Sequence, residues 1–440
     1  MERKIYDSLL AWKVKSNRKP LILEGARQVG KTWLMQEFGK REYNSYVYVN
    51  FDREVWAKNL FEHDYDINRI LLRLQAQTNV RIVAGETLII FDELQEAARG
   101  LGVLKYFQEE APEQHVIVAG SLLGITLHQG QSFPVGKVDI LRVQPLTFVE
   151  FLYALGEDAK ARSIEQHDWD VLQSLSYSYE ELLRQYYFVG GMPEAVAKFA
   201  ANHDLEEVRA IQQNILSGYR HDISKHAPTR EVQRILQVLH SLPSQLSREN
   251  KKFLYGVLRN GARAKEYELA IQWLIDAGVV IKVPRTSEAI MPLSFYEDLS
   301  AFKLFLLDNG LLGCLARVPA SQVLGGEHVF REWKGAFTEQ FVLQQLLFKR
   351  LPIYYWSNNN SECEIDFLLQ TETRIIPIEV KAEENVHSKS LRYFIQNLYP
   401  SLKGLRISLR PYIDQVWMEN IPLYAAGEAD VLTSVAVAKM

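Results

Sequence analysis

The chain has 440 residues, a formal net charge of −4, 47% apolar residues and 24% charged residues. This composition is typical of a folded globular protein and excludes a disordered or membrane-embedded chain. Two cysteines, Cys314 and Cys363, are too few and too far apart for a disulfide framework or a cysteine metal cluster. Because the sequence has no signal-like start and no membrane-length apolar run, we expect a cytoplasmic protein of about three domains.

The N-terminal third alternates strand-like apolar runs with helical patterns, which predicts a parallel α/β sheet with crossover helices. From about residue 148 to residue 240 the pattern is helical, with one break at residues 190–193. The following order of short helices, a helix at 267–276 and a strand pair is typical of a winged helix. Strands are predicted at 21–23, 46–51, 88–91, 115–119 and 138–143, and the strand pair at 279–283 and 289–292.

After about residue 325 the pattern indicates another α/β domain, with a helix at 330–349 and strands at 353–356, 365–369 and 375–381. The sequence therefore predicts a division into four parts. These are an α/β core at 1–155, a helical lid or connector at 156–230, a winged-helix-like domain at 231–325 and a C-terminal α/β domain at 326–440.

A phosphate-binding loop lies between the first strand and a helix predicted at 32–38. Residues 25–32 match the pattern G-x-x-x-x-G-K-[ST] in the strand-loop-helix context that this motif requires. Backbone N–H groups and the helix N-terminus favour phosphate, Lys31 is expected to reach the β and γ phosphates, and Thr32 to offer its hydroxyl to Mg²⁺. The residues expected to contact ATP are Gly25, Ala26, Arg27, Gln28, Val29, Gly30, Lys31, Thr32 and Trp33.

A second half of the site is predicted at Asp92 and Glu93, which end the strand 88–91. A carboxylate at this edge can hold Mg²⁺, so we assign Asp92 to the metal and Glu93 to the general base that activates water. The strand 46–51 is inserted between the loop and Asp92 in the sequence. This insertion, together with the glutamate, resembles the P-loop NTPases of the AAA+ and RecA-like (ASCE) class.

Two further residues are candidates for the same site. Ser121 follows the strand 115–119 and either senses the γ-phosphate or is a plain turn hydroxyl. Arg142 either approaches a phosphate in its own or a neighbouring subunit or forms an ordinary surface ion pair.

Several motifs along the chain resemble the prokaryotic AAA-type ATP-binding proteins that carry a C-terminal DUF4143 domain, the AAA_14/DUF4143 family. The resemblance implies an ATPase fold, a winged-helix module and a C-terminal nuclease-like module. It also suggests that Pro193 lies against the nucleotide base, although a helix-breaking loop explains this proline equally well. The matching stretches are 25–32, 88–95, 144–151, 187–193, 264–267, 273–278 and 307–311.

The last domain carries a possible nuclease site. Strand alternation places Glu379 and Lys381 on one face, where Asp366 is expected to join Glu379 in binding Mg²⁺ and Lys381 to orient water or stabilise charge. The set resembles the PD-(D/E)XK restriction-endonuclease-like fold, with Glu339 as its helical acid. The usual proline before the aspartate is replaced by Ile365. Such folds also serve as binding modules without cleavage.

The middle of the chain is basic, because residues 219–285 hold twelve Lys and Arg against six Asp and Glu. Double-stranded DNA bound through residues 245–285 is one explanation, and a protein-binding winged helix is another. We therefore expect an ATPase that couples nucleotide turnover to DNA binding or processing. Assembly into a homo-oligomer is compatible with this function. The alternative is a nucleotide-gated signalling switch whose nuclease-like domain only binds a partner. The basic residues expected at the DNA are Arg248, Lys251, Lys252, Arg259, Arg263, Lys265, Lys282 and Arg285.

Overall fold

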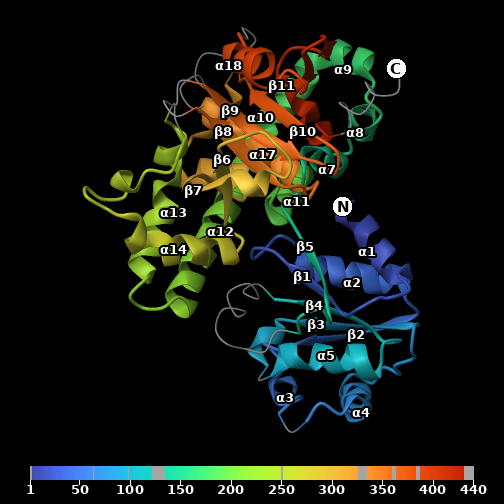
Figure 1. The fold of residues 1–440 in the computed structure, drawn as a ribbon. Helices are drawn as coiled ribbons and strands as arrows, with labels where there is room; N and C mark the ends of the chain where they lie inside the picture. Colours follow the sequence, from blue (N-terminus) through green and yellow to red (C-terminus); the bar gives the residue numbers. More distant parts are fainter. Residues whose placement is uncertain are drawn as a thin grey trace. The chain divides into compact units, whose positions relative to one another are not determined.

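The computed structural model describes residues 2–62, 64–97, 99–120, 134–248, 251–325, 334–358, 363–382 and 387–430. The chain folds into two compact units. We call Glu2–Gln144 together with Asp276–Val279 the N-terminal unit, and Pro145–Ile275 together with Val280–Met440 the C-terminal unit. Figure 1 gives the element labels used below.

The N-terminal unit is built on a sheet of five parallel strands in the order β2-β3-β4-β1-β5. Strand β3 is buried along its whole length, as expected for a parallel sheet covered on both faces. Its strands are β1 (Leu21–Glu24), β2 (Ser45–Asn50), β3 (Thr87–Asp92), β4 (His115–Ala119) and β5 (Asp139–Arg142). Its helical segments are α1 (Ile5–Val14), α2 (Lys31–Glu42), α3 (Val55–Lys58), α4 (Ile67–Thr78), η1 (Leu94–Glu96) and α5 (Gly100–Glu110).

Helices cover both faces of this sheet, with α2 and α5 on opposite sides (Figure 1). Every second residue of β3, Ile89 and Phe91, packs with Phe107 of α5 and Leu74 of α4 in one core cluster. All five predicted strands of this unit are confirmed within one or two residues at each end. The parallel α/β fold predicted from the sequence is therefore confirmed.

The strand that lies between the phosphate loop and Asp92 in the sequence does not lie between β1 and β3 in the sheet. Strand β2 lies at the edge of the sheet, whereas β4 separates β1 from β3. The phosphate loop and Asp92 therefore extend from strands that are not neighbours in the sheet.

The C-terminal unit combines a helical half with a mixed sheet. Helix α10 packs against α15 and α16, and α12 packs against α11 and α15. The helices are α7 (Phe148–Ala154), α8 (Asp158–Glu165), α9 (Trp169–Ser174), α10 (Ser176–Val189), α11 (Pro193–Asn202), α12 (Leu205–His226), α13 (Val232–Leu246), α14 (Ala264–Asp276), α15 (Asn309–Leu315), α16 (Ala320–Leu324), α17 (Lys334–Leu347) and α18 (Lys389–Tyr393). Shorter turns are η2 (Tyr255–Val257), η3 (Leu293–Tyr296), η4 (Phe394–Leu398) and η5 (Leu423–Glu428).

The mixed sheet has eight strands in the order β12-β13-β11-β10-β9-β8-β6-β7. Strands β8, β9 and β10 form an antiparallel meander, and β11 then runs parallel to β10. Helix α17 packs against β10, and α18 packs against β9 and β10. The strands are β6 (Val280–Thr286), β7 (Glu297–Leu306), β8 (Ile353–Ser357), β9 (Glu364–Gln370), β10 (Ile375–Val380), β11 (Gly404–Ser408), β12 (Ile413–Asp414) and β13 (Met418–Pro422).

Two features of this sheet differ from the predicted pattern. The predicted strand at 289–292 is wrong, because the partner of β6 is β7, which begins at Glu297. The strand pair assigned to a winged helix also continues directly into the larger sheet, since β6 pairs with β8. The predicted helix 330–349 begins at Lys334 among the described residues and ends at Leu347. The division of the chain into four domains stays a prediction.

In the parts of the chain that the structure describes, no helix combines the length and apolar character that a membrane crossing requires.

Candidate nucleotide site

The loop after β1 adopts backbone conformations that glycine permits. Gly25 has φ +144° and Gly30 has φ +92°, while Gln28 adopts the left-handed region at φ +68°. A Cβ atom on Gly25 would lie 2.4 Å from the carbonyl oxygen of Val143, so no larger residue fits without moving the loop. Helix α2 begins immediately after Gly30, which places its N-terminal N–H groups at the loop.

Lys31, the first residue of α2, lies under this loop. Its Nζ donates hydrogen bonds to the carbonyl oxygens of Gly25, at 2.7 Å, and Ala26, at 2.8 Å. Burial lowers the pKa of Lys31 to about 8, although the carboxylates of Glu93 and Asp92 act in the opposite direction. A buried cation beside a glycine-rich loop suits a strongly anionic ligand such as a triphosphate.

Thr32 and Asp92 meet although their strands are not neighbours. Thr32 Oγ1 donates to Asp92 Oδ2 at 2.8 Å, and Tyr48 Oη donates to the same oxygen at 2.9 Å. Burial raises the pKa of Asp92, while these two hydrogen bonds lower it. A hydroxyl and a carboxylate are the oxygen ligands that Mg²⁺ prefers beside nucleotide phosphates, so the donor set fits this ion.

Glu93 follows Asp92 in the left-handed region, with φ +53°. Gln95 Nε2 donates to Glu93 Oε2 at 2.5 Å, which restricts the position of the carboxylate. Asp92 and Glu93 thus lie at the same edge of the sheet, but their carboxylates have different hydrogen-bond partners.

The remaining predicted residues of this site have varied positions. Arg142 Nη2 lies 3.6 Å from Glu24 Oε2, and the Arg142 side chain is 64% exposed. This contact is the surface ion pair that the sequence offered as the alternative to a phosphate contact. Trp33 is 44% exposed beside Thr32. Ser121 lies outside the described residues. The contacts of all these residues with ATP stay predictions.

Pro193 belongs to the C-terminal unit, where it starts helix α11. The preceding glycines have a structural reason of their own. Gly191 N donates to Asp308 Oδ2 at 2.6 Å, and a Cβ atom on Gly190 would lie 2.2 Å from Asp308 Oδ1. This local packing explains the glycines without a nucleotide, and the contact of Pro193 with the base stays a prediction.

Sequence reasoning missed two residues that support the site. Arg3, buried near the N-terminus, donates to the carbonyl oxygens of Val29, at 3.2 Å, and Gln144, at 2.6 Å. It thereby holds the loop to the segment after β5. Tyr48 could have been suspected, because it lies near the carboxyl end of β2 and that strand pairs with β3.

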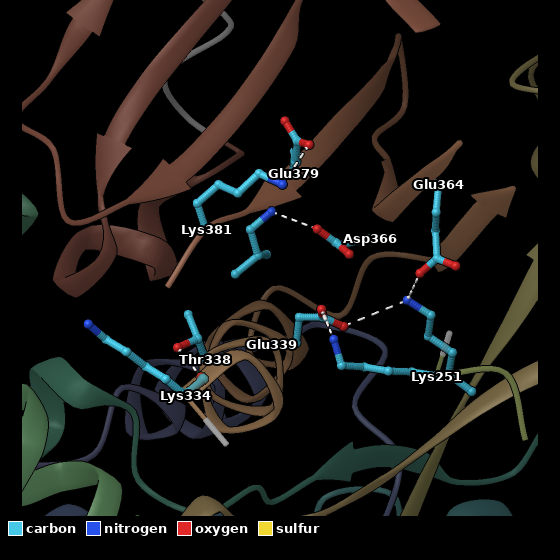
Figure 2. A network of polar contacts seen from close by, with 10 residues as sticks. Lys251, Lys334, Thr338, Glu339, Glu364, Asp366, Glu379 and Lys381 are labelled. Carbon is cyan, nitrogen blue, oxygen red and sulfur yellow. Dashed lines mark hydrogen bonds and ion pairs between the residues drawn. The ribbon is translucent and has the colours of Figure 1, made fainter. Parts of the chain in front are cut away.

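The C-terminal unit contains the predicted nuclease residues. Asp366 Oδ2 accepts a 2.8 Å hydrogen bond from the backbone N–H of Val380, and Lys381 Nζ lies 3.0 Å from Glu379 Oε1 (Figure 2). Glu339 of α17 forms ion pairs with Lys251 and, at 3.7 Å, with Lys303. Among the described residues, no group of three or more His, Cys, Asp or Glu side chains is arranged to hold a metal ion. The assignment of Mg²⁺ to Asp366 and Glu379 stays a prediction.

The electrostatics of this cluster are set by burial and by the lysines. Burial, together with Glu339, raises the pKa of Asp366 to about 8. Burial also favours a higher pKa for Glu339, yet Lys251 and Lys303 bring it below its ordinary value. The pKa of Lys381 is raised, because Glu379 outweighs the effect of burial.

The predicted basic surface is divided. Arg248, Arg259, Arg263, Lys265 and Lys282 are exposed. Within the same segment, Lys251 is bound to Glu339, and Arg285 lies 3.6 Å from Asp298. DNA binding by these residues stays a prediction.

The sheet order and the loop define the N-terminal unit as a P-loop NTPase domain. Comparison with known families agrees, because residues 17–152 match the model of the AAA domain. Residues 180–322 and 334–422 match two domains of unknown function, DUF8612 and DUF4143 respectively. The chain therefore combines an AAA-type ATPase domain with a C-terminal DUF4143 domain, as the sequence motifs suggested.

No curated protein matches the chain. A Walker-type ATPase of Pyrococcus abyssi shares 15% identity over 72% of this chain and 95% of its own, with a TM-score of 0.45. The Aeropyrum pernix Orc1 protein in complex with DNA shares 12% identity over 72% and 91%, with a TM-score of 0.26. Drosophila ORC bound to DNA shares 15% over 71% and 93%, with a TM-score of 0.27. At these TM-scores the fold assignment rests on the sheet order and the AAA-domain match.

Proposed function

We propose that the protein binds ATP with Mg²⁺ at the loop of residues 25–32 and hydrolyses it. The observation that carries this proposal is the hydrogen bond between Thr32 and Asp92 beside the buried Lys31. It supports the proposal, because P-loop NTPases hold Mg²⁺ with a loop hydroxyl and a strand-end carboxylate and contact the phosphates with the loop lysine.

In this mechanism the loop N–H groups bind the phosphates and Lys31 moves from the loop carbonyls to the β and γ phosphates. Thr32 and Asp92 would hold Mg²⁺, which would supply positive charge beside the phosphates. Glu93 accepts the proton of the attacking water. Gln95 orients Glu93 through the hydrogen bond described above.

The test compares ATP binding with ATP hydrolysis in Glu93→Gln. Because this substitution removes the base and leaves the loop intact, we expect affinity close to wild type and a kcat lower by about 100-fold or more. Glu96→Gln is the matched control, since Glu96 is a carboxylate of the adjacent η1 turn, and it should hydrolyse ATP normally. Hydrolysis by Glu93→Gln at the wild-type rate would remove Glu93 from the mechanism.

We further propose that ATP turnover is coupled to double-stranded DNA. Exposed Arg263 and Lys265 flank the first residue of α14 and support this step, because clustered cations bind phosphates. Arg259 lies nearby in the sequence but is paired with Glu266. Fluorescence anisotropy with a duplex should show weaker binding and a smaller salt dependence for the double variant Arg263→Ala/Lys265→Ala. Lys198→Ala, on α11, is the control.

The competing function is the nucleotide-gated switch. Three results together would favour this function over the first. DNA would not change the rate of ATP turnover, no duplex would bind at low salt, and the oligomeric state would depend on the bound nucleotide. Duplex-stimulated hydrolysis that the double variant loses would instead support the DNA-coupled ATPase.

We also infer that the C-terminal domain has a PD-(D/E)XK-like fold. Support comes from helix α17 followed by the β8-β9-β10 meander and by β11 parallel to β10. Asp366, Glu379 and Lys381 occupy the motif positions on β9 and at the end of β10. An experimental structure in which Asp366 and Glu379 extend from opposite faces of the sheet would contradict this inference.

A further inference from the structure

A cluster of four carboxylates lies where α17 meets the mixed sheet. We call Glu339, Glu364, Asp366 and Glu379 the acidic cluster; Figure 2 shows them extending from α17, β9 and β10. Glu339 and Glu379 are almost fully buried. Carboxylates at this depth require positive charges nearby, because burial of an unpaired charge is very costly.

Lysines from outside the DUF4143 match supply much of that charge. Lys251, which precedes η2, forms an ion pair with Glu339 Oε1, and both side chains are about nine-tenths buried. Lys303 of β7 is fully buried, with its Nζ 3.7 Å from Glu339 Oε2 and 2.5 Å from Glu364 Oε1. Both oxygens of the helical carboxylate therefore face ammonium groups.

The remaining oxygens make an incomplete set for a metal. Mg²⁺ requires near-octahedral oxygen ligands, usually one or two carboxylates with several waters. Asp366 Oδ2 accepts the N–H of Val380, and Glu379 Oε1 faces Lys381. Glu379 Oε2 and Glu339 Oε2 are both buried without a hydrogen-bond partner. Because Glu339 Oε2 lies 3.7 Å from the ammonium of Lys303, Glu379 Oε2 is the one of these two that no lysine faces. The opposite side of the cluster, at Glu339, is taken by lysines.

We propose that Lys251 and Lys303 are built-in counter-ions that take the place of a divalent cation in the acidic cluster. The C-terminal unit then holds no Mg²⁺ and does not cleave nucleic acids. Three ammonium groups, of Lys251, Lys303 and Lys381, already face the acidic cluster, so a divalent ion would add two further positive charges beside them. The fully buried Lys303 is the fixed counter-ion, and Lys251 is the one whose removal opens the cluster.

Binding of Mn²⁺, followed by electron paramagnetic resonance without nucleotide, tests this directly on the full chain. Wild type and Asp366→Asn should give the same Mn²⁺ binding, since the acidic cluster contributes none. A duplex and a single-stranded DNA incubated with wild type and Mg²⁺ should remain intact. Mn²⁺ binding or DNA cleavage that wild type shows and Asp366→Asn loses would overturn the proposal, whatever the behaviour of any lysine variant.

Lys251→Met tests the role assigned to the lysine. Methionine is unbranched and only one atom shorter than lysine, and it carries no charge. Mn²⁺ should therefore bind at least about tenfold more tightly than to wild type, because a unit charge a few ångströms away no longer repels it. The double variant Lys251→Met/Asp366→Asn should lose the gained binding. Lys265→Met, on the exposed surface of α14, is the matched control and should bind Mn²⁺ like wild type.

Thermal unfolding supplies a second readout, because Lys251→Met leaves Glu339 without one of its partners and should lower the melting temperature. Added Mn²⁺ should raise the melting temperature of Lys251→Met and leave that of wild type unchanged. A folded Lys251→Met that gains no Mn²⁺ binding would overturn the assignment of Lys251 as a counter-ion in the place of a metal. If the variant does not fold, the wild-type arm above decides the proposal.

Discussion

Thr32 Oγ1 and Asp92 Oδ2 are joined by a 2.8 Å hydrogen bond, although the strands that precede them are separated by β4. The two side chains assigned to Mg²⁺ thus approach each other across an intervening strand. Tyr48 shares the same oxygen of Asp92 from the edge strand. One carboxylate oxygen of Asp92 therefore accepts hydrogen bonds from both Thr32, at the start of α2, and Tyr48, on β2.

Thr32→Val should separate magnesium binding from phosphate binding. Valine has nearly the same shape as threonine but no hydroxyl, so we expect the enhancement of ATP affinity by Mg²⁺ to fall by about tenfold or more, with Mg²⁺-free binding changed little. Titration of ATP with and without Mg²⁺ measures the difference. Tyr48→Phe is the control, because it removes the other hydrogen bond on Asp92 and no metal ligand; an equal loss in both variants would contradict the role of Thr32.

Gly25→Ala should abolish ATP binding without unfolding the N-terminal unit. The added Cβ would lie 2.4 Å from Val143 O and the residue has φ +144°, so the loop must move away from its phosphate-binding shape. Gly85→Ala is the matched control, since Gly85 also has a positive φ, of +74°, but open space around it. Circular dichroism and ATP titration of both variants check this. ATP affinity that remains normal in Gly25→Ala is the contrary result.

The candidate residues that the structure brings together at the loop belong to continuous motifs of the sequence. The pattern of residues 25–32 implies its own backbone geometry, and the apolar run before Asp92 places that carboxylate at a strand end. Tyr48 and Arg3 were not predicted, because their roles arise from contacts with residues 44 and 141 positions away in the chain. Tyr48 is indicated only by its place near the carboxyl end of a strand that pairs with β3, and nothing in the local sequence indicates Arg3.

The C-terminal unit was harder to predict for related reasons. The run at 289–292 is apolar, yet Pro292 has no N–H for a sheet, whereas the true strand β7 begins with polar Glu297 and Asp298. Lys251 was predicted to face DNA, and Lys303 was not predicted to have any role. Their burial against Glu339 depends on how separate segments pack.

His115 should make stability depend on pH. Burial lowers its pKa from 6.5 to about 4, and its Nδ1 lies 2.6 Å from Tyr43 Oη. Because the unfolded chain binds the proton more readily, this contribution is fully present above pH 6.5 and is lost as the pH falls toward 4.

His115→Phe removes this titration, so the stability difference between wild type and variant should shrink or reverse by about 1–3 kcal/mol over that pH range. Urea unfolding at a series of pH values, followed for both proteins, measures the difference. Parallel pH dependences would show that His115 does not titrate differently in the folded and unfolded chains.

Asp308→Ala should destabilise the C-terminal unit more than the loss of an ordinary helix cap. Asp308 caps α15 by accepting Leu311 N at 2.9 Å, and it also accepts Gly191 N at 2.6 Å and Gln344 Nε2 at 3.0 Å. The side chain is fully buried, so alanine leaves the N–H groups of Gly191 and Leu311 without this acceptor, whereas Gln344 keeps its hydrogen bond to Tyr186. The loss should cost about 3 kcal/mol or more.

Asp204→Ala is the matched control, because Asp204 also caps a helix, α12, through Glu206 N and Glu207 N. Its side-chain hydrogen bonds are exposed, so water replaces them and we expect a loss of only about 1 kcal/mol. Urea unfolding of both variants under one set of conditions gives the comparison. A loss for Asp308→Ala no larger than that for Asp204→Ala would mean that the contact with Gly191 contributes little, and the glycines at 190 and 191 would then need a reason other than this carboxylate.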